Sequence, residues 1–356
     1  MNNNLAKQYN NSFQESSFTN DIVPISVLEE CITETVIGQD EAVRSVSTSV
    51  YSAHYFNIPC VDLVIGGSGC GKTLLISKIC KEMSLPYTIE QSTQYSEEGY
   101  IGMDTSDMLA HLFKNSNGDL TKAESGILAI DEICKIKKQC SDKDVSGAGV
   151  QDSLLGILSG ATIQFHLDKL SRDIPFDTKN LKIFLMGAFE GLDEIRAKRI
   201  NTKPSIGFSS TPTEKVDNSI PTDGNLRSKY YTNEDLINYG FSAEFVGRIR
   251  RIHILNPITV DILVRILKES NESCFLRYEN SLMNAAHIKL QYSDNLMVNI
   301  AKEVLIANTG ARDLERVVNY IFEDIMHTVF SCNRTIKAIH MFDNIVNDNT
   351  CYEIIS

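Results

Sequence analysis

The sequence predicts an α/β fold with a parallel sheet flanked by helices, and two segments carry that prediction. Residues 60–65 form a short apolar run typical of a buried strand, and residues 66–73, "GGSGCGKT", follow it directly. A helix-period apolar run comes next, and a second apolar run, residues 127–130, ends in Asp131 and Glu132. Apolar strands that alternate with helices are typical of parallel sheets covered on both faces.

The first segment matches the pattern G-x-x-x-x-G-K-[ST], which predicts a phosphate-binding loop. Its glycines let backbone N–H groups curl around phosphate oxygens, and the N-terminus of the following helix adds a partial positive charge. Lys72 can reach the β- and γ-phosphates, and the Thr73 hydroxyl can bind Mg²⁺. The strand before the loop and the helix after it make a chance glycine-rich turn the weaker interpretation.

The second segment supplies the acidic partners that phosphoryl transfer needs. We expect Asp131 to hold Mg²⁺ through water, and Glu132 to orient and activate the attacking water. An acidic pair at the end of a strand is common, so it gains meaning only beside a phosphate-binding loop. The two segments together predict a nucleoside triphosphatase.

Composition narrows the class further. The chain has 356 residues, enough for two or three domains, and its formal charge of −12 argues against binding to nucleic acid duplexes. No apolar run of about 18 residues exists, so we expect no membrane-spanning helix and no membrane partner. The nine cysteines are scattered and never form a CxxC pair, so we expect neither a disulfide framework nor a zinc site. Residues 1–34 begin with an Asn-, Gln- and Ser-rich stretch, and we expect a disordered polar tail there.

Several motifs in one order, from Val36 to Phe330, resemble the ClpX family of AAA+ ATPases, which feed the ClpP peptidase. The resemblance implies an AAA+ large ATPase domain over residues 35–257 and a small, mainly helical AAA+ lid domain over residues 258–345, with a tail at 346–356. It also implies ATP and Mg²⁺ as cofactors and a ring of subunits, either a homo-hexamer or a mixed ring.

The resemblance assigns residues to the nucleotide. In "VIGQDEAV" (36–43), Val36 and Ile37 match positions that pack on adenine, although the residues alone indicate only a capped helix. In "FSAEFVGRIRR", Arg248 matches the arginine finger that reaches the nucleotide of the neighbouring subunit. In "NTGARDLERVV", Arg312 matches the sensor-2 arginine, with an exposed helix arginine as the alternative. The implied catalytic residues are Asp131, Glu132, Arg248 and Arg312, and the implied nucleotide-binding residues are Val36, Ile37, Gly67, Ser68, Gly69, Cys70, Gly71, Lys72, Thr73, Leu74 and Arg312.

Three further segments resemble the family's contacts with other proteins. "EEGYIGMD" places Tyr100 and Ile101 at the aromatic pore loop, where a large rigid side chain can grip any polypeptide, although a Tyr buried under a turn is the local alternative. Val145 matches the second pore loop. "SIGFSS" matches the loop that docks on ClpP, in which Ile206 and Phe208 are apolar anchors and Gly207 gives flexibility between them.

The chain also departs from the family pattern. We expect no N-terminal zinc domain, because the sequence has no paired-cysteine motif, and the basic loop expected at the pore entrance is replaced by a segment of mixed charge, "TIQFHLDKLSRDIPFDTKN". Cys134 stands where the family has Asp after the acidic pair, and the strand ending in Met186 and Gly187 offers no polar sensor-1 residue. These departures indicate a diverged paralogue.

The resemblance implies an ATP-dependent protein unfoldase and translocase, located in the cytoplasm or in the lumen of an organelle with a bacterial-type Clp system. Two alternatives stay open: a remodelling chaperone that works without a peptidase, and a nucleotide-switched scaffold that scarcely hydrolyses ATP. The HslU family fits less well, because it carries a large inserted domain and lacks the Ile-Gly-Phe loop.

Overall fold

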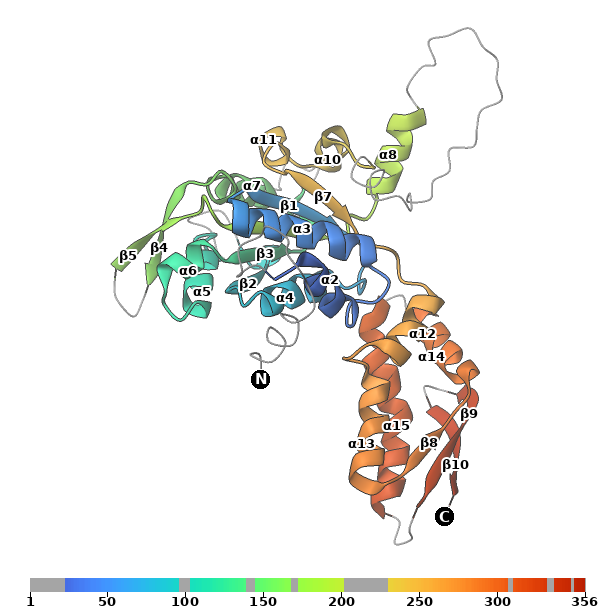
Figure 1. The fold of residues 1–356 in the computed structure, drawn as a ribbon. Helices are drawn as coiled ribbons and strands as arrows, with labels where there is room; N and C mark the ends of the chain where they lie inside the picture. The colour runs from blue at the N-terminus through green and yellow to red at the C-terminus, as the bar shows by residue number, and fades with distance from the viewer. Residues whose placement is uncertain are drawn as a thin grey trace.

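The computed structural model describes residues 23–95, 103–138, 145–167, 172–201, 230–306, 310–331, 336–346 and 349–355. Its centre is a five-stranded sheet with the strand order β2-β3-β6-β1-β7 (Figure 1). All neighbouring pairs in this sheet are parallel. The predicted α/β fold with a parallel sheet is therefore confirmed. The strands are β1 (Cys60–Ile65), β2 (Tyr87–Gln91), β3 (Ile127–Asp131), β6 (Lys182–Gly187) and β7 (Arg251–Ile254).

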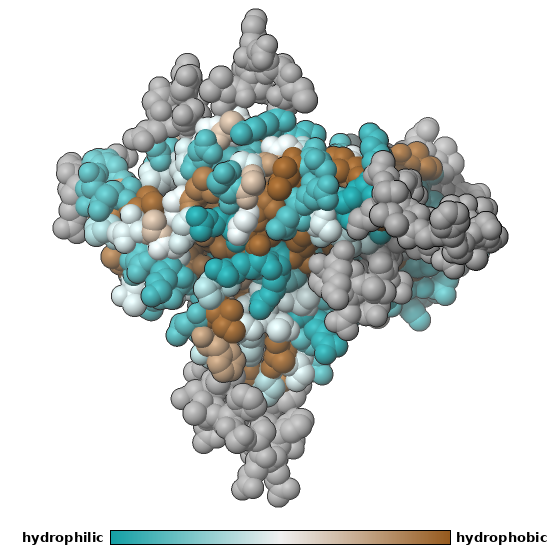
Figure 2. All heavy atoms as spheres, turned by 90° about the horizontal axis from the view of Figure 1, so that it is seen from above, coloured by the Kyte–Doolittle hydropathy of each residue, from teal (hydrophilic) through white to brown (hydrophobic). Residues whose placement is uncertain are grey.

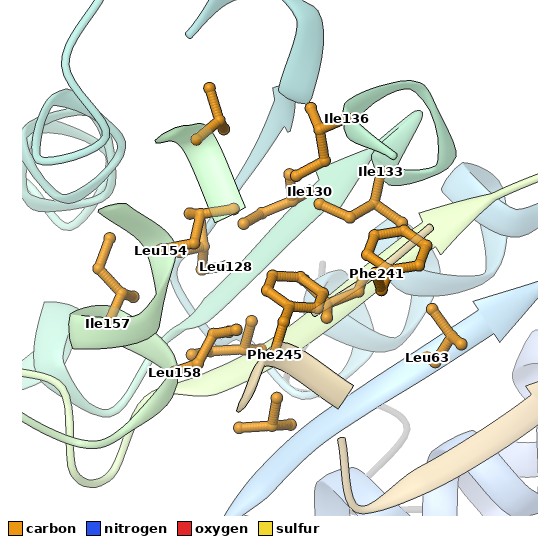
Figure 3. Packing of buried hydrophobic residues seen from close by; sticks show 14 of the residues in the cluster. Leu63, Leu128, Ile130, Ile133, Ile136, Leu154, Ile157, Leu158, Phe241 and Phe245 are labelled. Carbon is orange, nitrogen blue, oxygen red and sulfur yellow. The ribbon is translucent and has the colours of Figure 1, made fainter. Parts of the chain in front are cut away.

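Helices cover both faces of this sheet, and the alternation of side chains along each strand explains why. Along β1, Val61, Leu63 and Ile65 enter one hydrophobic cluster, whereas Cys60 and Val64 enter another on the opposite face. Figure 3 shows part of the first cluster, in which Leu63, Leu128 and Ile130 from the strands lie near Leu154 and Phe245 from the covering helices. A strand that is apolar on both faces is the expected pattern for a buried parallel sheet.

The helices that contribute to these clusters fall into two sets. The cluster with Cys60 and Val64 includes residues of α2 (Ile25–Thr33), α3 (Asp40–Phe56) and α4 (Lys72–Glu82). The cluster with Leu63 includes residues of α5 (Asp107–Asn115), α6 (Leu120–Glu124), α7 (Val145–Leu158), α10 (Asn233–Tyr239) and α11 (Ala243–Val246), and of the short helix η2 (Ile133–Ile136). The short helix η1 (Ser92–Gln94) follows β2.

Helix α2 corrects the predicted N-terminal tail. Residues 25–33, which were expected to belong to a disordered segment ending at residue 34, form this helix. Leu28 and Ile32 lie four residues apart on one face and are 4% and 0% exposed, so their burial against α3 and α4 stabilises it. Residues 1–22 lie outside the described residues.

A buried polar network lies between α3 and the edge of the sheet. Asp62 of β1 accepts a hydrogen bond from Ser49 of α3, and its Oδ2 lies 3.0 Å from Nε2 of His253 on β7. Nδ1 of His253 lies 2.6 Å from the hydroxyl of Ser45, and Arg251 donates to the Ser49 hydroxyl at 2.6 Å. Asp62 and His253 are 0% and 4% exposed, so this network replaces the apolar packing expected at two buried strand positions.

Two smaller features complete the N-terminal part. Strands β4 (Thr162–Leu167) and β5 (Arg172–Asp177) form an antiparallel hairpin. Helix α8 (Leu192–Asn201) is joined to α10 by Arg199, whose Nε and Nη2 donate to the two carboxylate oxygens of Asp235 at 2.7 and 2.8 Å. Asp235 also forms a capping box with Thr232 at the start of α10.

The C-terminal part has its own hydrophobic cluster, drawn from four helices and three strands. Figure 1 shows it as a separate body below the sheet. The helices are α12 (Val260–Glu269), α13 (Cys274–Ala286), α14 (Asp294–Ile306) and α15 (Asp313–Ser331), with the short helix η4 (Gly310–Arg312) before α15. The expected mainly helical character holds, but β8 (Lys289–Gln291), β9 (Ala338–Val346) and β10 (Asn349–Ile355) form a three-stranded sheet beside the helices. Residues 349–355, expected within a C-terminal tail, therefore pair with β9 as a strand.

The surface carries polar and apolar residues side by side. Seen from above in Figure 2, brown apolar residues gather in small patches between teal polar ones. Within the described ranges, no helix combines the length and the apolar character needed to cross a membrane.

Candidate active site

The phosphate-binding loop connects β1 to α4, as its sequence predicts. Helix α4 begins at Lys72, directly after Gly71, which adopts the left-handed conformation with φ 98° that glycine tolerates. The Lys72 ammonium donates to the carbonyls of Gly66 and Gly67 at 2.7 and 2.9 Å. The lysine therefore lies folded over the loop, where phosphate oxygens can replace the carbonyls as its acceptors.

Thr73 and Asp131 meet at the carboxyl edge of the sheet. The Thr73 hydroxyl donates to Oδ2 of Asp131 at 3.0 Å, while the backbone N–H of Glu132 donates to Oδ1 at 2.8 Å. Asp131 is 6% exposed, so little solvent competes for it. A hydroxyl and a carboxylate at this separation are hard oxygen donors of the kind that Mg²⁺ takes beside a nucleotide, and the residues present therefore fit the metal.

Glu132 occupies a strained position next to Asp131. Its φ of 57° lies in the left-handed region, which disfavours non-glycine residues, and its side chain is exposed. The hydroxyl of Ser92 donates to the Glu132 carbonyl at 2.9 Å, and Ser92 itself is fully buried just after β2. This bond from η1 stabilises the left-handed conformation of Glu132, whose side chain is exposed.

A cavity of about 280 Å³ adjoins the loop and lies between the two hydrophobic bodies of the chain. Its wall on the sheet side comes from the segment between α2 and α3 and from the phosphate-binding loop. Its other wall comes from α12, α13, η4 and α15. The sheet-side residues are Thr35, Val36, Ile37, Gly69, Cys70, Gly71 and Leu74, and the C-terminal ones are Ile258, Ile266, Leu267, Ser270, Glu272, Ser273, Cys274, Arg277, Ala311, Arg312, Leu314 and Glu315. The apolar members suit a flat base, and the loop end suits phosphates.

The short helix η4 brings the C-terminal part into contact with the loop. The N–H of Ala311 donates to the Gly69 carbonyl at 3.3 Å. Gly310 has φ 68°, and a Cβ at this position would lie 2.4 Å from the Ser68 carbonyl oxygen. Only glycine permits this approach, which places the exposed Arg312 at the cavity.

Two cysteines line the cavity, and both are held as thiols. Burial raises the pKa of the Cys70 thiol, and burial likewise raises the pKa of the Cys274 thiol. These side chains therefore act as small apolar residues at neutral pH.

Comparison with known proteins agrees with this geometry. The model of the AAA domain (Cdc48 subfamily) matches residues 60–252. The chain is 34% identical over 345 residues to the "ATP-dependent Clp protease ATP-binding subunit ClpX" of Borrelia duttonii, covering 90% of the chain and 78% of that protein. The chain belongs to the ClpX family of AAA ATPases. It is therefore an ATPase that uses a nucleotide and Mg²⁺.

Two further ClpX proteins show a similar extent of likeness. The ClpX of Treponema denticola is 34% identical over 84% of the chain and 75% of its own length. The ClpX of Bacteroides thetaiotaomicron is 32% identical over 85% of the chain and 76% of its own length. The expected membership in the ClpX family and the AAA+ fold are thus confirmed.

The structure places the predicted nucleotide-binding residues of this ClpX-family chain around one region. Those that line the cavity are Val36, Ile37, Gly69, Cys70, Gly71, Leu74 and Arg312, while Gly67, Ser68, Lys72 and Thr73 lie in the adjoining loop and the first turn of α4. Arg248 lies between α11 and β7, is exposed, and is not among the residues that line this cavity. The individual roles stay predictions.

Most residues predicted to contact other proteins lie outside the part of the chain that the structure describes. Tyr100 and Ile101, and the segment Ile206, Gly207 and Phe208, lie outside the described residues. Val145 opens α7, and its side chain is not described. Cys134 is buried in η2, where its Sγ would lie 3.1 Å from a Cβ on Gly187.

The prediction from sequence missed the C-terminal wall of the cavity. Ile266, Ser270 and Ser273 line it, yet none of them belongs to a motif. The sequence indicated this wall only indirectly. Arg312 was expected at the nucleotide, and residues of α15 follow it directly in the chain.

Proposed function

We propose that the chain hydrolyses ATP in a hexameric ring and threads protein substrates through a central pore into a ClpP-type peptidase. The observation that carries the proposal is the position of the nucleotide cavity, which has one wall on the sheet body and the other on the C-terminal body. A nucleotide bound there contacts both bodies, so hydrolysis and release can change the angle between them. That angular change supplies the pulling stroke.

The site residues take these roles in the proposal. Lys72 and Arg312 bind the phosphates, Thr73 and Asp131 hold Mg²⁺, and Glu132 activates the attacking water. Arg248 reaches the nucleotide of the neighbouring subunit, which agrees with its exposed position away from the cavity of its own chain. The large domain spans residues 35–257 and the small domain 258–345.

Contacts with other proteins follow from sequence positions in the proposal. Tyr100, Ile101 and Val145 line the pore and grip the substrate chain. Ile206, Gly207 and Phe208 dock into apolar pockets of the peptidase, and six such loops on one ring bind by avidity although each is weak alone. The protein then works wherever its peptidase resides, in the cytoplasm or in an organelle lumen with a bacterial-type Clp system.

The test is degradation of an unstructured, dye-labelled protein by a ClpP-type peptidase with ATP, compared between the unaltered chain and Phe208→Ala. Ser210→Ala, in the same segment, is the matched control, and Glu132→Gln reports dependence on hydrolysis. We expect degradation by the unaltered chain and by Ser210→Ala, and none by Phe208→Ala, which keeps its ATPase activity.

Two other outcomes distinguish the alternatives. ATP hydrolysis without degradation would overturn the peptidase contact and leave a remodelling ATPase that still depends on Tyr100. Tight ATP binding with almost no turnover would favour a nucleotide-switched scaffold. Sedimentation with ATP then shows whether the ring itself forms.

A further inference from the structure

The turn between α12 and α13, residues 270–273, makes polar contacts with the sheet body at three points. Nζ of Lys78 on α4 lies 2.8 Å from Oε1 of Glu272. The N–H of Asn271 donates to the Glu34 carbonyl at 3.0 Å, and its side-chain amide donates to Oε2 of Glu34 at 2.8 Å. The Ser270 hydroxyl donates to the Thr35 carbonyl at 3.3 Å. These contacts join two bodies that have separate hydrophobic clusters.

The same turn forms part of the nucleotide cavity. Ser270, Glu272 and Ser273 line it, and so does Thr35 on the opposite side. Thr35 immediately precedes Val36 and Ile37, the predicted adenine contacts. The polar contacts therefore run along the rim of the cavity, from the base end on one body to the turn on the other.

The turn is braced from within, so it moves together with its two helices. The N–H of Ser273 donates to the Ser270 carbonyl at 2.9 Å, and the Ser273 hydroxyl donates to the Leu267 carbonyl at 2.6 Å. The Ser273 hydroxyl also caps α13 by accepting from the N–H of Leu276. If the turn separates from Glu34 and Lys78, α12 and α13 move with it. The cavity then opens, because residues of both helices line it.

Lys78 connects the turn to the phosphate end of the site. It lies on α4, whose first residue is Lys72 of the phosphate-binding loop. The Lys78 side chain is 18% exposed and that of Glu272 is 52% exposed, so solvent screens the pair only in part. Neither side chain belongs to a hydrophobic cluster. We therefore expect that loss of this ion pair leaves the packing of both bodies intact.

We propose that residues 270–273 form a latch that holds the nucleotide cavity closed, and that Lys78, Glu272, Glu34 and Asn271 are positioning residues that set the rate of nucleotide release. The inference rests on a nucleotide occupying this cavity and is independent of any peptidase. A closed latch retains the nucleotide through hydrolysis, and an opened latch exchanges ADP for ATP.

The test is stopped-flow release of a fluorescent ADP analogue from Lys78→Gln and from Glu272→Gln, each compared with Lys81→Gln. Lys81 is an exposed lysine three residues further along the same helix, outside the cavity lining. The measured worth of partly exposed ion pairs predicts a release about 2- to 5-fold faster in both latch variants. The charge reversal Lys78→Glu with Glu272→Lys restores the slow release, and high salt narrows the difference.

A second readout separates positioning from folding. Hydrolysis of pre-bound ATP in a single turnover keeps its rate in Lys78→Gln, because Lys78 lies outside the cavity lining and the change leaves Thr73 and Asp131 in place. Asn271→Ala, which removes the amide contact to Glu34, should speed release in the same way. Release rates equal to those of Lys81→Gln, or a reversed pair that fails to restore slow release, would overturn the latch.

The variant Lys72→Ala distinguishes failure of the latch from failure of the assignment of the cavity to a nucleotide. If Lys72→Ala weakens binding of the analogue while the latch variants release it normally, the cavity stands and the latch is wrong. If Lys72→Ala leaves binding unchanged, the analogue binds elsewhere and the nucleotide assignment itself fails, and the latch fails with it.

Discussion

The hydroxyl of Thr73 donates a hydrogen bond to the Asp131 carboxylate at 3.0 Å and thereby joins the first turn of α4 to the last residue of β3. These residues are 58 positions apart in the chain, and each is the member of its motif that we propose as a metal ligand. The two side chains of the proposed Mg²⁺ site lie in contact because the parallel strands β1 and β3 end at the same edge of the sheet.

We predict that Thr73→Ala lowers kcat for ATP hydrolysis by about 100-fold, the scale seen when one polar contact to a developing charge is lost. It also raises the Mg²⁺ concentration needed for half-maximal rate, because one oxygen donor is removed. Steady-state ATPase rates titrated with Mg²⁺ measure both effects, and Thr73→Ser serves as the control that keeps the hydroxyl. An unchanged Mg²⁺ requirement in Thr73→Ala would remove Thr73 from the metal site.

Gly310 makes a second prediction. A Cβ at residue 310 would lie 2.4 Å from the Ser68 carbonyl oxygen, so Gly310→Ala forces η4 away from the loop. We expect weaker ATP binding, measured by titration, in addition to the strain of about 1–2 kcal/mol that a left-handed Ala carries. Gly191→Ala is the matched control, since Gly191 has φ 85° but a Cβ there would make only an ordinary contact, 3.7 Å from Oε2 of Glu194. Equal ATP affinity in the two variants would contradict the close approach.

The sequence was informative where a function depends on neighbouring residues and less so where it depends on distant ones. The phosphate-binding loop and the Asp131–Glu132 pair are local patterns, and the strands and helices around them follow from apolar periodicity. The contact of Asn271 with Glu34 joins residues 237 positions apart, and no local pattern records it.

The same limit applies to two features of the fold. Helix α2 carries only Leu28 and Ile32 as its buried apolar pair, and the polar stretch before it masked that signal. Asp62 is a single charged residue inside an apolar strand, and the sequence of that strand does not indicate its partner. The partner is His253, which comes from β7. Burial of a carboxylate is costly unless it is paired, so its partner must be known before its burial can be explained.

The pair formed by Arg199 and Asp235 predicts how acid affects α10. Burial alone would raise the pKa of Asp235, but hydrogen bonds from Arg199 and Thr232 outweigh it and hold the pKa below its usual range. A lowered pKa in the folded state means that the pair contributes stability above the pKa of the unfolded chain, near 4, and loses it as the pH falls through the folded pKa.

We therefore predict that Asp235→Asn lowers the free energy of local opening of α10 by about 1.5–3 kcal/mol at neutral pH, the worth of hydrogen bonds to a charged group. The difference between the variant and the unaltered chain shrinks once the pH falls below about 4, where the unfolded carboxyl is protonated. Hydrogen exchange of the amides in residues 233–239 measures this locally. Glu234→Gln, one residue earlier and exposed, is the control. A difference that stays constant with pH would contradict the assignment.

The network around Asp62 makes the last prediction. Asp62→Ala leaves the buried His253 ring without its carboxylate and the Ser49 hydroxyl without its acceptor, so we expect a loss of about 3–5 kcal/mol in the stability of the sheet body. One oxygen of Asp62, Oδ1, is buried with no hydrogen-bond partner among the described residues, which already reduces the net worth of the network.

Removing both members, as in Asp62→Val with His253→Val, should therefore cost much less than the sum of Asp62→Val and His253→Val, because valine fills a strand position without an unmatched polar group. Hydrogen exchange of the β1 and β7 amides in the four proteins gives the coupling free energy, expected to be at least about 1 kcal/mol for residues in contact. Additive losses would mean that the two side chains do not stabilise each other, and that β7 is held against β1 by its backbone hydrogen bonds alone.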